Sequence, residues 1–439
     1  MQPRKCDCSP MCSLRAANPM RVRPVRTGGA TFASQSAYLR FAPDHGDLAA
    51  RAAGYAVLAH DPAVPAVAAD YWMHSERFYQ AALAPLKRDL DGDPAFERLR
   101  ANPADATAER LLAERIGALL EQDPALARTL CRVVDAADDE VYINYFRGVD
   151  YRPDASPVGP ERLERITEGR RHGRTGTGRD VLVVIPLSDR DGAGRIRNLT
   201  ACLLALNDQT FPADRYCVTV VEFDDRPRWQ SVIEPWVDRY LHLPGSGLFN
   251  KSWTLNAGVR ATPGEFRTLC LLDADIIVDR EFIERNHARF ADPGHDAHLP
   301  HTEMLSLDAA SSDRAIEERC GTGAPQAPLE GMRGLLLRDV PGACLWTRPE
   351  LFHRVGGFDE RYRGWGGEDE DMLYRVAAAG AVTQFDDVFL HLAHRRPPMR
   401  TAEGKPFNAH VPLGTWTGRD GYGDLAGPVA VEDRTATGA

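Results

Sequence analysis

Two patterns of apolar and polar residues divide this chain, and the change between them falls near residue 180. Before it, residues 46–59, 66–90 and 106–139 are rich in Ala, Leu, Arg and Glu and are separated by breaks that contain Pro, which predicts helices. After it, short apolar runs alternate with helical segments, which predicts a sheet with parallel strands. The pattern therefore predicts a helical N-terminal region followed by an α/β domain.

The apolar runs also locate the expected elements and units. We expect strands at 181–186, 216–223, 241–243, 267–273 and 342–346 and helices at 195–207, 229–240, 252–261 and 349–355. The expected units are a disordered tail (1–30), a helical domain (31–168), a Gly- and Arg-rich linker (169–180), an α/β domain (181–396) and a C-terminal extension (397–439). For the extension, three roles stay open: a wrap around the domain, a mobile lid, or a loose segment.

An acidic cluster follows a loop of glycines and one tryptophan in residues 364–371, GWGGEDED. Residues 372–379 carry apolar side chains at helical spacing and stop at Gly380, so the acids precede or begin a helix. The helix dipole there favours an ionised carboxylate, the form that a general base requires. Capping alone also explains such acids, because Asp and Glu are enriched in first turns.

Two further groups of polar residues interrupt apolar runs. Asp273 and Asp275 lie within residues 269–278, and two aspartates at a strand end can hold a divalent cation that bridges a diphosphate. His391 and His394, in the apolar run 388–394, could complete the metal ligands. Each motif alone is common in ordinary turns and cores, so only their combination indicates a site.

Residues 181–394 carry these motifs in an order that resembles a known family. They are VLVVIP (181–186), FDD (223–225), FNKSWTLNAG (249–258), DAD (273–275), GGFDE (356–360), the GWGGEDED run and the two histidines. The set resembles GT-A glycosyltransferases, particularly the β-1,4-galactosyltransferase, chondroitin-type and polypeptide N-acetylgalactosaminyltransferase group. The resemblance implies a Rossmann-like, mostly parallel sheet that moves a hexose or N-acetylhexosamine from a nucleotide sugar, with UDP favoured, using Mn²⁺ or Mg²⁺.

The resemblance also implies roles for individual residues. Asp369 matches the catalytic base and Glu368 a residue that binds the acceptor sugar. The implied acceptor-binding residues are Trp365, Gly366 and Gly367. The implied metal ligands are Asp275, His394 and His391, the last at a position where galactosyltransferases have methionine. The implied donor-binding residues are Pro186, Arg190, Phe223, Asp225, Lys251, Asn256 and Asp273.

Departures from the family pattern bear on the mechanism. Galactosyltransferases have Phe-Arg-x-Arg after the first strand, whereas residues 186–191 read PLSDRD and keep one arginine. Retaining polypeptide N-acetylgalactosaminyltransferases have Glu-Asn in place of Glu368-Asp369, and an Asp-x-His metal motif. Both of these differences favour inversion, in which Asp369 deprotonates an acceptor hydroxyl that attacks the anomeric carbon opposite the leaving nucleotide.

The composition of the chain limits which binding partners and which cellular compartment are expected. The 53 basic and 63 acidic residues give a net charge of −10, which argues against nucleic acid as a partner. Nine cysteines are an odd number and favour thiols in a reducing cytoplasm, and Cys6, Cys8 and Cys12 lack a fourth zinc ligand at the usual spacing. No apolar run reaches the roughly 18 residues of a membrane span, and no signal peptide is expected.

Alternative functions and acceptors stay open at this point. The expected partners are a nucleotide-sugar donor and a glycan, natural-product or peptide acceptor, and the N-terminal domain is expected to pack on the catalytic domain or to self-associate. A retaining transferase of the same fold is one alternative. A sugar nucleotidyltransferase is another, although it would need a Gly-rich phosphate loop after the first strand. An inactive glycan-binding relative is the third, and the joint presence of Asp275, Glu368, Asp369 and His394 argues against it.

Overall fold

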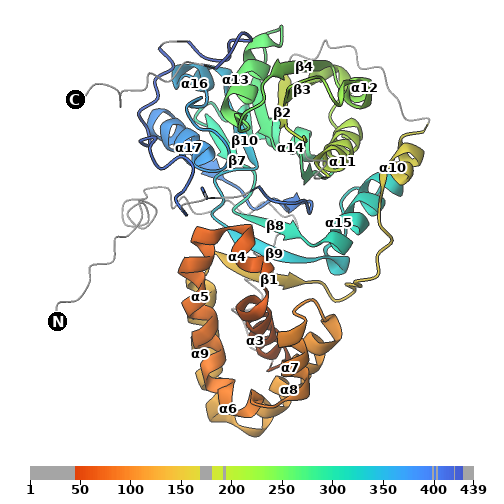
Figure 1. Ribbon diagram of the computed structural model, residues 1–439, viewed down its shortest axis with the longest axis vertical. Coiled ribbons are helices and arrows are strands. Elements are labelled where there is room, and N and C mark those ends of the chain that lie inside the picture. Colours follow the sequence, from red (N-terminus) through yellow and green to blue (C-terminus); the bar gives the residue numbers. More distant parts are fainter. Residues whose placement is uncertain are drawn as a thin grey trace, which may run out of the picture.

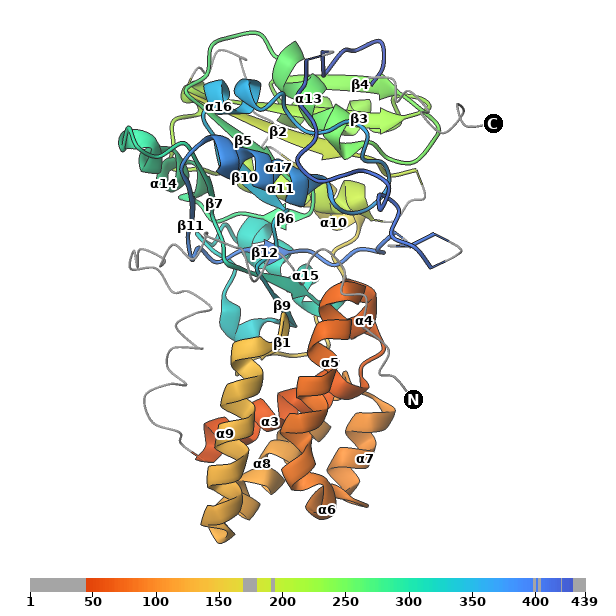
Figure 2. The same cartoon turned by 90° about the vertical axis from the view of Figure 1, so that its left-hand side faces the viewer.

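The computed structural model describes residues 45–168, 180–190, 194–397, 400–401, 404–419 and 421–428. The described parts follow one another along the long axis of the molecule, with N-terminal helices at one end, a small sheet in the middle and the main sheet at the other end (Figures 1 and 2). The predicted α/β class with a helical N-terminal region is confirmed. The predicted tail at 1–30 and nearly all of the predicted linker lie outside the described residues.

Short helices with aspartate caps build the N-terminal region. Asp93, Asp105 and Asp123 each accept backbone N–H groups at the start of a helix, so the Pro-containing breaks in the sequence mark real helix boundaries. The predicted helix 66–90 is broken near Pro85, and the predicted helix 106–139 is broken at Asp123. The helices are α3 (His45–His60), α4 (Ala63–Val67), α5 (Ala69–Leu83), α6 (Lys87–Leu90), α7 (Pro94–Ala101), α8 (Ala106–Gln122) and α9 (Pro124–Glu140). The next helix, α10 (Pro160–Thr167), lies instead beside the main sheet, against the helix at Arg195–Asn207 (Figure 1).

A strand that the sequence did not predict ties this region to the rest. β1 (Ile143–Arg147) pairs antiparallel with β9 (Arg333–Arg338), so the N-terminal region is not wholly helical. The small sheet has the order β1-β9-β8-β12-β6, with β8 at Glu303–Leu307, β12 at Leu390–His391 and β6 at Ile276–Ile277. It was not expected, because its strands come from distant parts of the chain. The strand-like run 388–394 is a strand only at β12.

The main sheet is mostly parallel, as predicted. β5 (Thr268–Leu272), β2 (Val181–Leu187), β3 (Tyr216–Asp224) and β4 (Arg239–Pro244) are parallel neighbours. β10 (Cys344–Thr347) runs antiparallel to β5 and continues the sheet to β7 (Ala297–Leu299) and β11 (Val382–Gln384). The carboxyl ends of the four parallel strands therefore meet at one edge, where α/β proteins hold their ligands.

Helices cover both faces of this sheet. In β2, Val181, Val183 and Ile185 join one buried cluster and Leu182 and Val184 join the other, which explains why the strand is a continuous apolar run. The helices are α11 (Arg195–Asn207), α12 (Gln230–Ile233), α13 (Lys251–Ala261), α14 (Phe282–Ala288), α15 (Ala309–Ile316), α16 (Pro349–Arg354) and α17 (Glu368–Ala379).

One predicted helix of the α/β part is wrong. Residues 229–240 form only α12 and a 3-10 turn at Glu234–Trp236, and the chain is extended again from Val237. The carboxylate of Asp238 accepts the N–H of Val218 at 2.7 Å, which places the following residues beside β3. Strand β4 is accordingly longer than the predicted strand at 241–243. None of the described helices has both the length and the apolar character that crossing a bilayer requires.

Candidate active site

A buried lysine gathers three carboxylates at the carboxyl edge of the main sheet. Lys251 is the first residue of α13, and its Nζ lies 2.9 Å from Asp273 Oδ1, 2.8 Å from Asp369 Oδ2 and 3.6 Å from Glu368 Oε1. Asp273 directly follows β5, and the other two acids form the first turn of α17. We call these four residues the lysine cluster. The sequence placed them in three separate motifs, and the fold brings them together.

Burial and mutual charge set the protonation of the lysine cluster. Burial disfavours the ammonium of Lys251, but the three carboxylates outweigh this effect and hold its pKa well above the usual value. Burial and the charge of Asp369 raise the pKa of Glu368 to about 7, against the opposing effect of Lys251. Burial also raises the pKa of Asp273 above its usual value. Glu368 is therefore about half protonated near neutral pH.

Glycines let two backbone segments approach the acids closely. A Cβ atom at Gly342 would lie 2.3 Å from Asp369 Oδ2, so residue 342 has no room for a side chain while Asp369 keeps its position. Gly366 and Gly367 have φ of 91° and 95°, a backbone conformation that glycine adopts readily, and they precede α17. Trp365, beside them, keeps 37% of its surface exposed. The three predicted acceptor-loop residues thus directly precede the predicted base.

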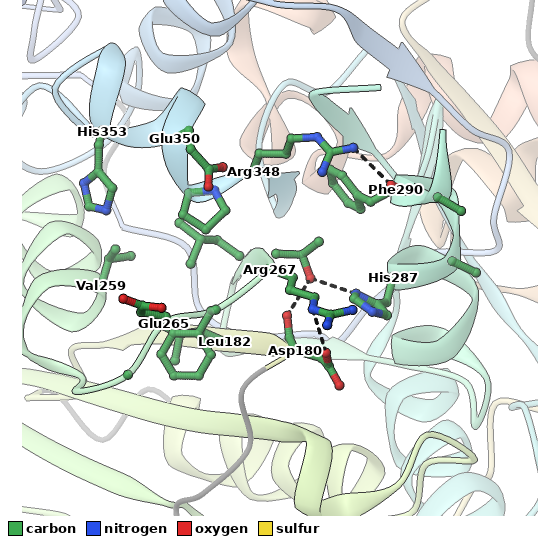
Figure 3. Close-up of a pocket in the computed structure, with 17 residues that line it drawn as sticks. Asp180, Leu182, Val259, Glu265, Arg267, His287, Phe290, Arg348, Glu350 and His353 are labelled. Atoms are coloured by element: carbon green, nitrogen blue, oxygen red, sulfur yellow. Dashed lines mark hydrogen bonds and ion pairs between the residues drawn. The ribbon is translucent and has the colours of Figure 1, made fainter. Parts of the chain in front are cut away.

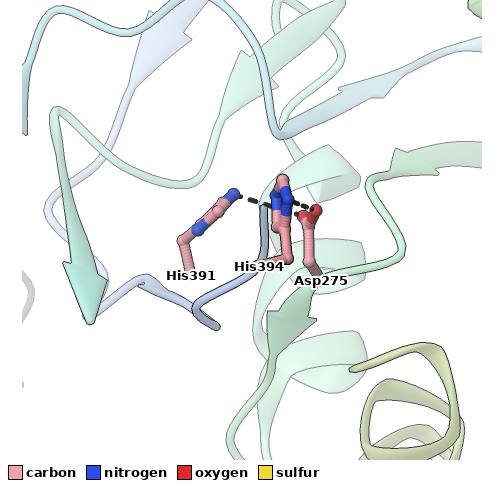
Figure 4. A group of neighbouring side chains, drawn as sticks. All are labelled: Asp275, His391 and His394. Atoms are coloured by element: carbon pink, nitrogen blue, oxygen red, sulfur yellow. Dashed lines mark ion pairs between the residues drawn. The ribbon is translucent and has the colours of Figure 1, made fainter. Parts of the chain in front are cut away.

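A second group of residues has the character of a metal centre. His394 Nε2 lies 2.9 Å from Asp275 Oδ2 and His391 Nε2 lies 3.5 Å from Asp275 Oδ1, and Figure 4 shows the three side chains converging. Pairing of β12 with β6 sets His391 opposite Ile276, which explains how residues so far apart in sequence meet. We call Asp275, His391 and His394 the metal triad.

The triad fits a divalent cation. Asp275 Oδ1 and His391 Nδ1 are buried polar atoms without a hydrogen-bond partner among the described residues, and a bound ion would satisfy such a carboxylate oxygen. Burial alone would raise the pKa of Asp275, but the two histidines outweigh it and the pKa lies below its usual range. Burial lowers the pKa of His391 to about 3, so its imidazole is neutral and able to bind metal.

Two arginines beside the metal triad were not found by sequence reasoning. Arg195 Nη1 lies 4.0 Å from Asp275 Oδ2. The half-buried Arg396 donates to Ser306 Oγ at 3.0 Å, and its pKa is lowered by desolvation and by Arg195, against the opposing charge of Asp275. Positive side chains next to a metal triad suit a diphosphate. Arg396 is two residues after His394, and this proximity in the sequence could have indicated its place beside the triad. No sequence motif indicated the same for Arg195.

The other predicted donor-binding residues lie around β2, β3 and α13. Arg190 donates to the carbonyls of Gly245 and Gly247 at 2.6 and 2.8 Å and covers the ring of Phe223 at 4.9 Å. Asp225 is paired with Arg228 at 3.0 Å. The guanidinium of Arg190 thus already holds the loop after β4, and its donor contact stays a prediction.

Asn256 and Pro186 are buried within the fold. The amide of Asn256 donates to Phe358 O at 2.8 Å and to Glu360 Oε1 at 2.9 Å, so it joins α13 to the segment that precedes the acceptor loop. Pro186 lies in β2 opposite Val221 of β3. The predicted donor roles of both residues remain untested.

A cavity of about 1050 Å³ lies away from these residues (Figure 3). Asp180 and Thr268, at the amino ends of β2 and β5, contribute to its lining, so it opens at the opposite edge of the sheet from the acids. Its arginines are already engaged, Arg267 with Asp180 at 3.3 Å and Arg348 with the carbonyls of Phe290 and His295 at 3.0 Å. The cavity contains none of the predicted site residues.

Comparison with known proteins agrees with the family resemblance. Residues 338–403 match the family model described as the N-terminal domain of galactosyltransferase, a segment that holds the acceptor loop, the acids and both histidines. A pre-mycofactocin glycosyltransferase of Mycobacterium tuberculosis is 28% identical over 265 residues, covering 59% of this chain and 49% of that protein. Human beta-1,4-galactosyltransferase 3 is 27% identical over 142 residues, covering 32% and 29%. The predicted resemblance to glycosyltransferases is confirmed.

A validoxylamine A glucosyltransferase of Streptomyces hygroscopicus subsp. limoneus is 28% identical over 228 residues, covering 45% of this chain and 48% of that protein. The chain spans about half the length of these bacterial relatives. Among solved structures, TarS residues 1–349 of S. aureus align with a TM-score of 0.34 and 15% identity over 48% of this chain and 60% of that chain. The mannosyltransferase PcManGT of Pyrobaculum calidifontis aligns with a TM-score of 0.32 and 18% identity over 53% and 62%.

Proposed function

We propose that this protein is a metal-dependent, inverting glycosyltransferase that moves a hexose or N-acetylhexosamine from a UDP sugar to an acceptor hydroxyl. The observation that carries the proposal is the division of the Asp-x-Asp motif between two clusters. Asp273 turns to the lysine cluster, which holds the candidate base, and Asp275 turns to the metal triad. A nucleotide leaving group and an acceptor hydroxyl thus have separate, adjacent binding partners at one sheet edge.

Three residues of the lysine cluster and the neighbouring Trp365 have roles in this reaction. Asp369 takes the proton of the acceptor hydroxyl, whose oxygen forms a bond to the anomeric carbon while the bond to the nucleotide diphosphate breaks. Glu368, with its pKa raised to about 7, can donate a hydrogen bond to an acceptor oxygen at neutral pH. Lys251 keeps the three acids together and offsets their repulsion. The half-exposed Trp365 offers an aromatic face on which a sugar can pack.

The triad and its arginines would serve the leaving group. Asp275, His391 and His394 would hold a divalent cation, which would supply positive charge to the departing diphosphate. Two imidazole nitrogens in the ligand set favour Mn²⁺ over Mg²⁺, which prefers oxygen ligands. Arg195 supplies further positive charge near Asp275. The named activities of the relatives make galactose and glucose the first donor sugars to test.

Nucleotide release tests the proposal directly. The protein is incubated with Mn²⁺ and UDP, GDP, dTDP and CDP sugars, and free nucleotide is measured with and without a chelator. We expect release from a UDP sugar that stops when the metal is chelated. Nucleotide release at the same rate with and without the chelator would contradict the metal assignment. An absence of release together with an absence of UDP binding in calorimetry contradicts the transferase assignment, whereas binding without release identifies an inactive relative or an enzyme that requires its acceptor.

Metal binding can be measured without any substrate. Mn²⁺ at about 100 times its dissociation constant is expected to raise the free energy of unfolding by about 2.7 kcal/mol. Asp275→Asn should remove this gain, because it removes a charged ligand and leaves two imidazoles. Asp279→Asn is the control, since Asp279 lies just beyond β6, is paired with Arg285 and is outside the triad. An equal gain in the Asp275 variant would show that the ion binds elsewhere.

A further inference from the structure

We propose that Asn408, in the C-terminal extension, is a positioning residue that fixes the acceptor loop, defined here as residues 363–367. The inference rests on the proposed function, because it assigns that loop to the acceptor. It also gives the extension a role that the sequence left open. Asn408 is 8% exposed and lies outside the lysine cluster and the metal triad.

The side chain of Asn408 binds the backbone of the loop at three points. Its Nδ2 donates to Gly366 O at 2.7 Å and to Trp365 O at 3.3 Å, and its Oδ1 accepts the N–H of Arg363 at 3.0 Å. One amide therefore spans the loop from Arg363 to Gly366. Only an amide supplies two donors and an acceptor in this arrangement.

The loop needs such an external restraint. Gly364, Gly366 and Gly367 all have positive φ, between 75° and 95°, and glycines allow many other backbone conformations. The N–H of Gly364 is held by Phe249 O at 2.8 Å, which fixes the first half of the loop. Asn408 binds the carbonyls of the second half, which carries Trp365. Fixing them before the acceptor arrives lowers the entropy cost of acceptor binding.

The extension that presents Asn408 is itself anchored to the body of the domain. Gly414 N–H donates to the buried Asp371 Oδ1 at 2.7 Å, two residues after the candidate base. Further along, Trp416 Nε1 donates to Gly356 O at 2.7 Å and Trp253 Nε1 donates to Asp424 O at 2.7 Å. The residues that follow Asn408 in the chain are thus hydrogen-bonded to the domain at three places. These contacts hold Asn408 beside the acceptor loop.

Hydrogen exchange of the loop amides tests the positioning role without an acceptor. We would compare the wild type with Asn408→Ala, Asn408→Asp and the control Tyr422→Phe, all with UDP and Mn²⁺ present. Tyr422 bonds His353 Nδ1 at 2.7 Å and anchors the extension elsewhere. We expect exchange in 363–367 to accelerate about 10-fold or more in Asn408→Ala, in line with the loss of hydrogen bonds to the backbone. The aspartate should accelerate it too, since a carboxylate accepts from Arg363 but cannot donate to the two carbonyls.

The outcomes separate this inference from the proposed function. Unchanged exchange in Asn408→Ala, or the same acceleration in Tyr422→Phe, would overturn the positioning role. A wild type that fails to bind UDP with Mn²⁺ would overturn the proposed function, while the exchange result would still decide whether Asn408 fixes the loop.

Kinetics give the second readout, with free N-acetylglucosamine as the acceptor probe. With UDP-galactose saturating, Asn408→Ala should raise the KM for the probe about 10-fold and leave UDP affinity within about 2-fold. A fall in kcat and UDP affinity with no change in this KM would assign Asn408 a purely structural role and overturn the inference.

Discussion

The lysine cluster and the metal triad each contain one aspartate of the same Asp-x-Asp motif, Asp273 and Asp275 respectively. The two clusters differ in what surrounds that aspartate. In the lysine cluster, three acids surround an ammonium that the chain itself supplies. In the metal triad, one carboxylate faces two histidines, and the buried Asp275 Oδ1 lacks a hydrogen-bond partner among the described residues. Buried charge must be compensated. In the first cluster Lys251 offsets part of the charge of the acids, whereas the second leaves a buried carboxylate oxygen of Asp275 that an ion from solution would satisfy.

This difference teaches which half of the site is preorganised. The lysine cluster has its geometry before any ligand binds, because its ion pairs are internal. In the triad, Asp275 Oδ1 would gain a partner only when a metal binds. We therefore expect donor binding to depend on the metal, while Asp369 keeps its position without it. The predictions below test that separation.

The largest expected effect is the loss of the base. Asp369→Asn should lower the rate of sugar transfer by about 10² to 10⁴-fold, because the amide cannot accept the hydroxyl proton. UDP binding with Mn²⁺, measured by calorimetry, should stay within a few-fold. Glu370→Gln is the matched control, since Glu370 is the next residue and is not among the ionic partners of Lys251. Near-native transfer by the Asp369 variant would refute the base assignment.

Removal of the positive charge of Lys251 should lower the free energy of unfolding. Lys251→Met leaves three partly buried acids without their counter-ion, and the loss should be at most the roughly 3–5 kcal/mol that breaking a fully buried pair costs. Urea denaturation measures the loss, with the exposed Lys87→Met as control. The double variant with Asp369→Asn should be less destabilised than Lys251→Met alone, because one of the repelling charges is gone. Equal stability of wild type and Lys251→Met would show that the lysine does not compensate the acids.

A single methyl group should displace the base without affecting the triad. Gly342→Ala places a Cβ atom 2.3 Å from the present position of Asp369 Oδ2, so the carboxylate must move. A displacement on the order of 1 Å can cost about 10²-fold in rate. UDP binding with Mn²⁺ should be retained. Gly159→Ala is the control, because nothing lies within 4 Å of its added Cβ. If metal-dependent UDP binding fell as much as transfer, the two clusters would not be separable.

The smallest expected effect is the pH dependence of stability. The pKa of Glu368 is raised from 4.5 to about 7 in the folded protein. Between these values the folded protein keeps a proton that the unfolded chain has lost, so the free energy of unfolding falls as pH rises through this window and levels off above about pH 7. Glu368→Gln removes this term. Its stability relative to the wild type should therefore increase by about 1–3 kcal/mol from pH 5 to pH 8.

Denaturation curves at several pH values measure this difference, with the exposed Glu114→Gln as control. A constant difference between Glu368→Gln and the wild type across the range would show that Glu368 does not hold the extra proton.

The sequence determined the α/β pattern and the candidate groups, because these follow from local rules. Residues 181–187 are apolar throughout since both sheet faces are covered, and the acids of α17 lie in its first turn, where such residues are favoured. The wrong helix at 229–240 shows the limit of local pattern, since contact of Asp238 with β3 decided the extended conformation.

Only the tertiary structure decided how the groups are partnered. The resemblance grouped Asp275 with the two histidines, but no pattern in the sequence predicted that Asp273, two residues away, pairs with Lys251 and the acids of α17. The small sheet, Arg195 beside the triad and Asn408 on the acceptor loop likewise depend on contacts between residues far apart in the chain. Such contacts depend on how the whole chain packs, and local patterns of polarity carry no record of them.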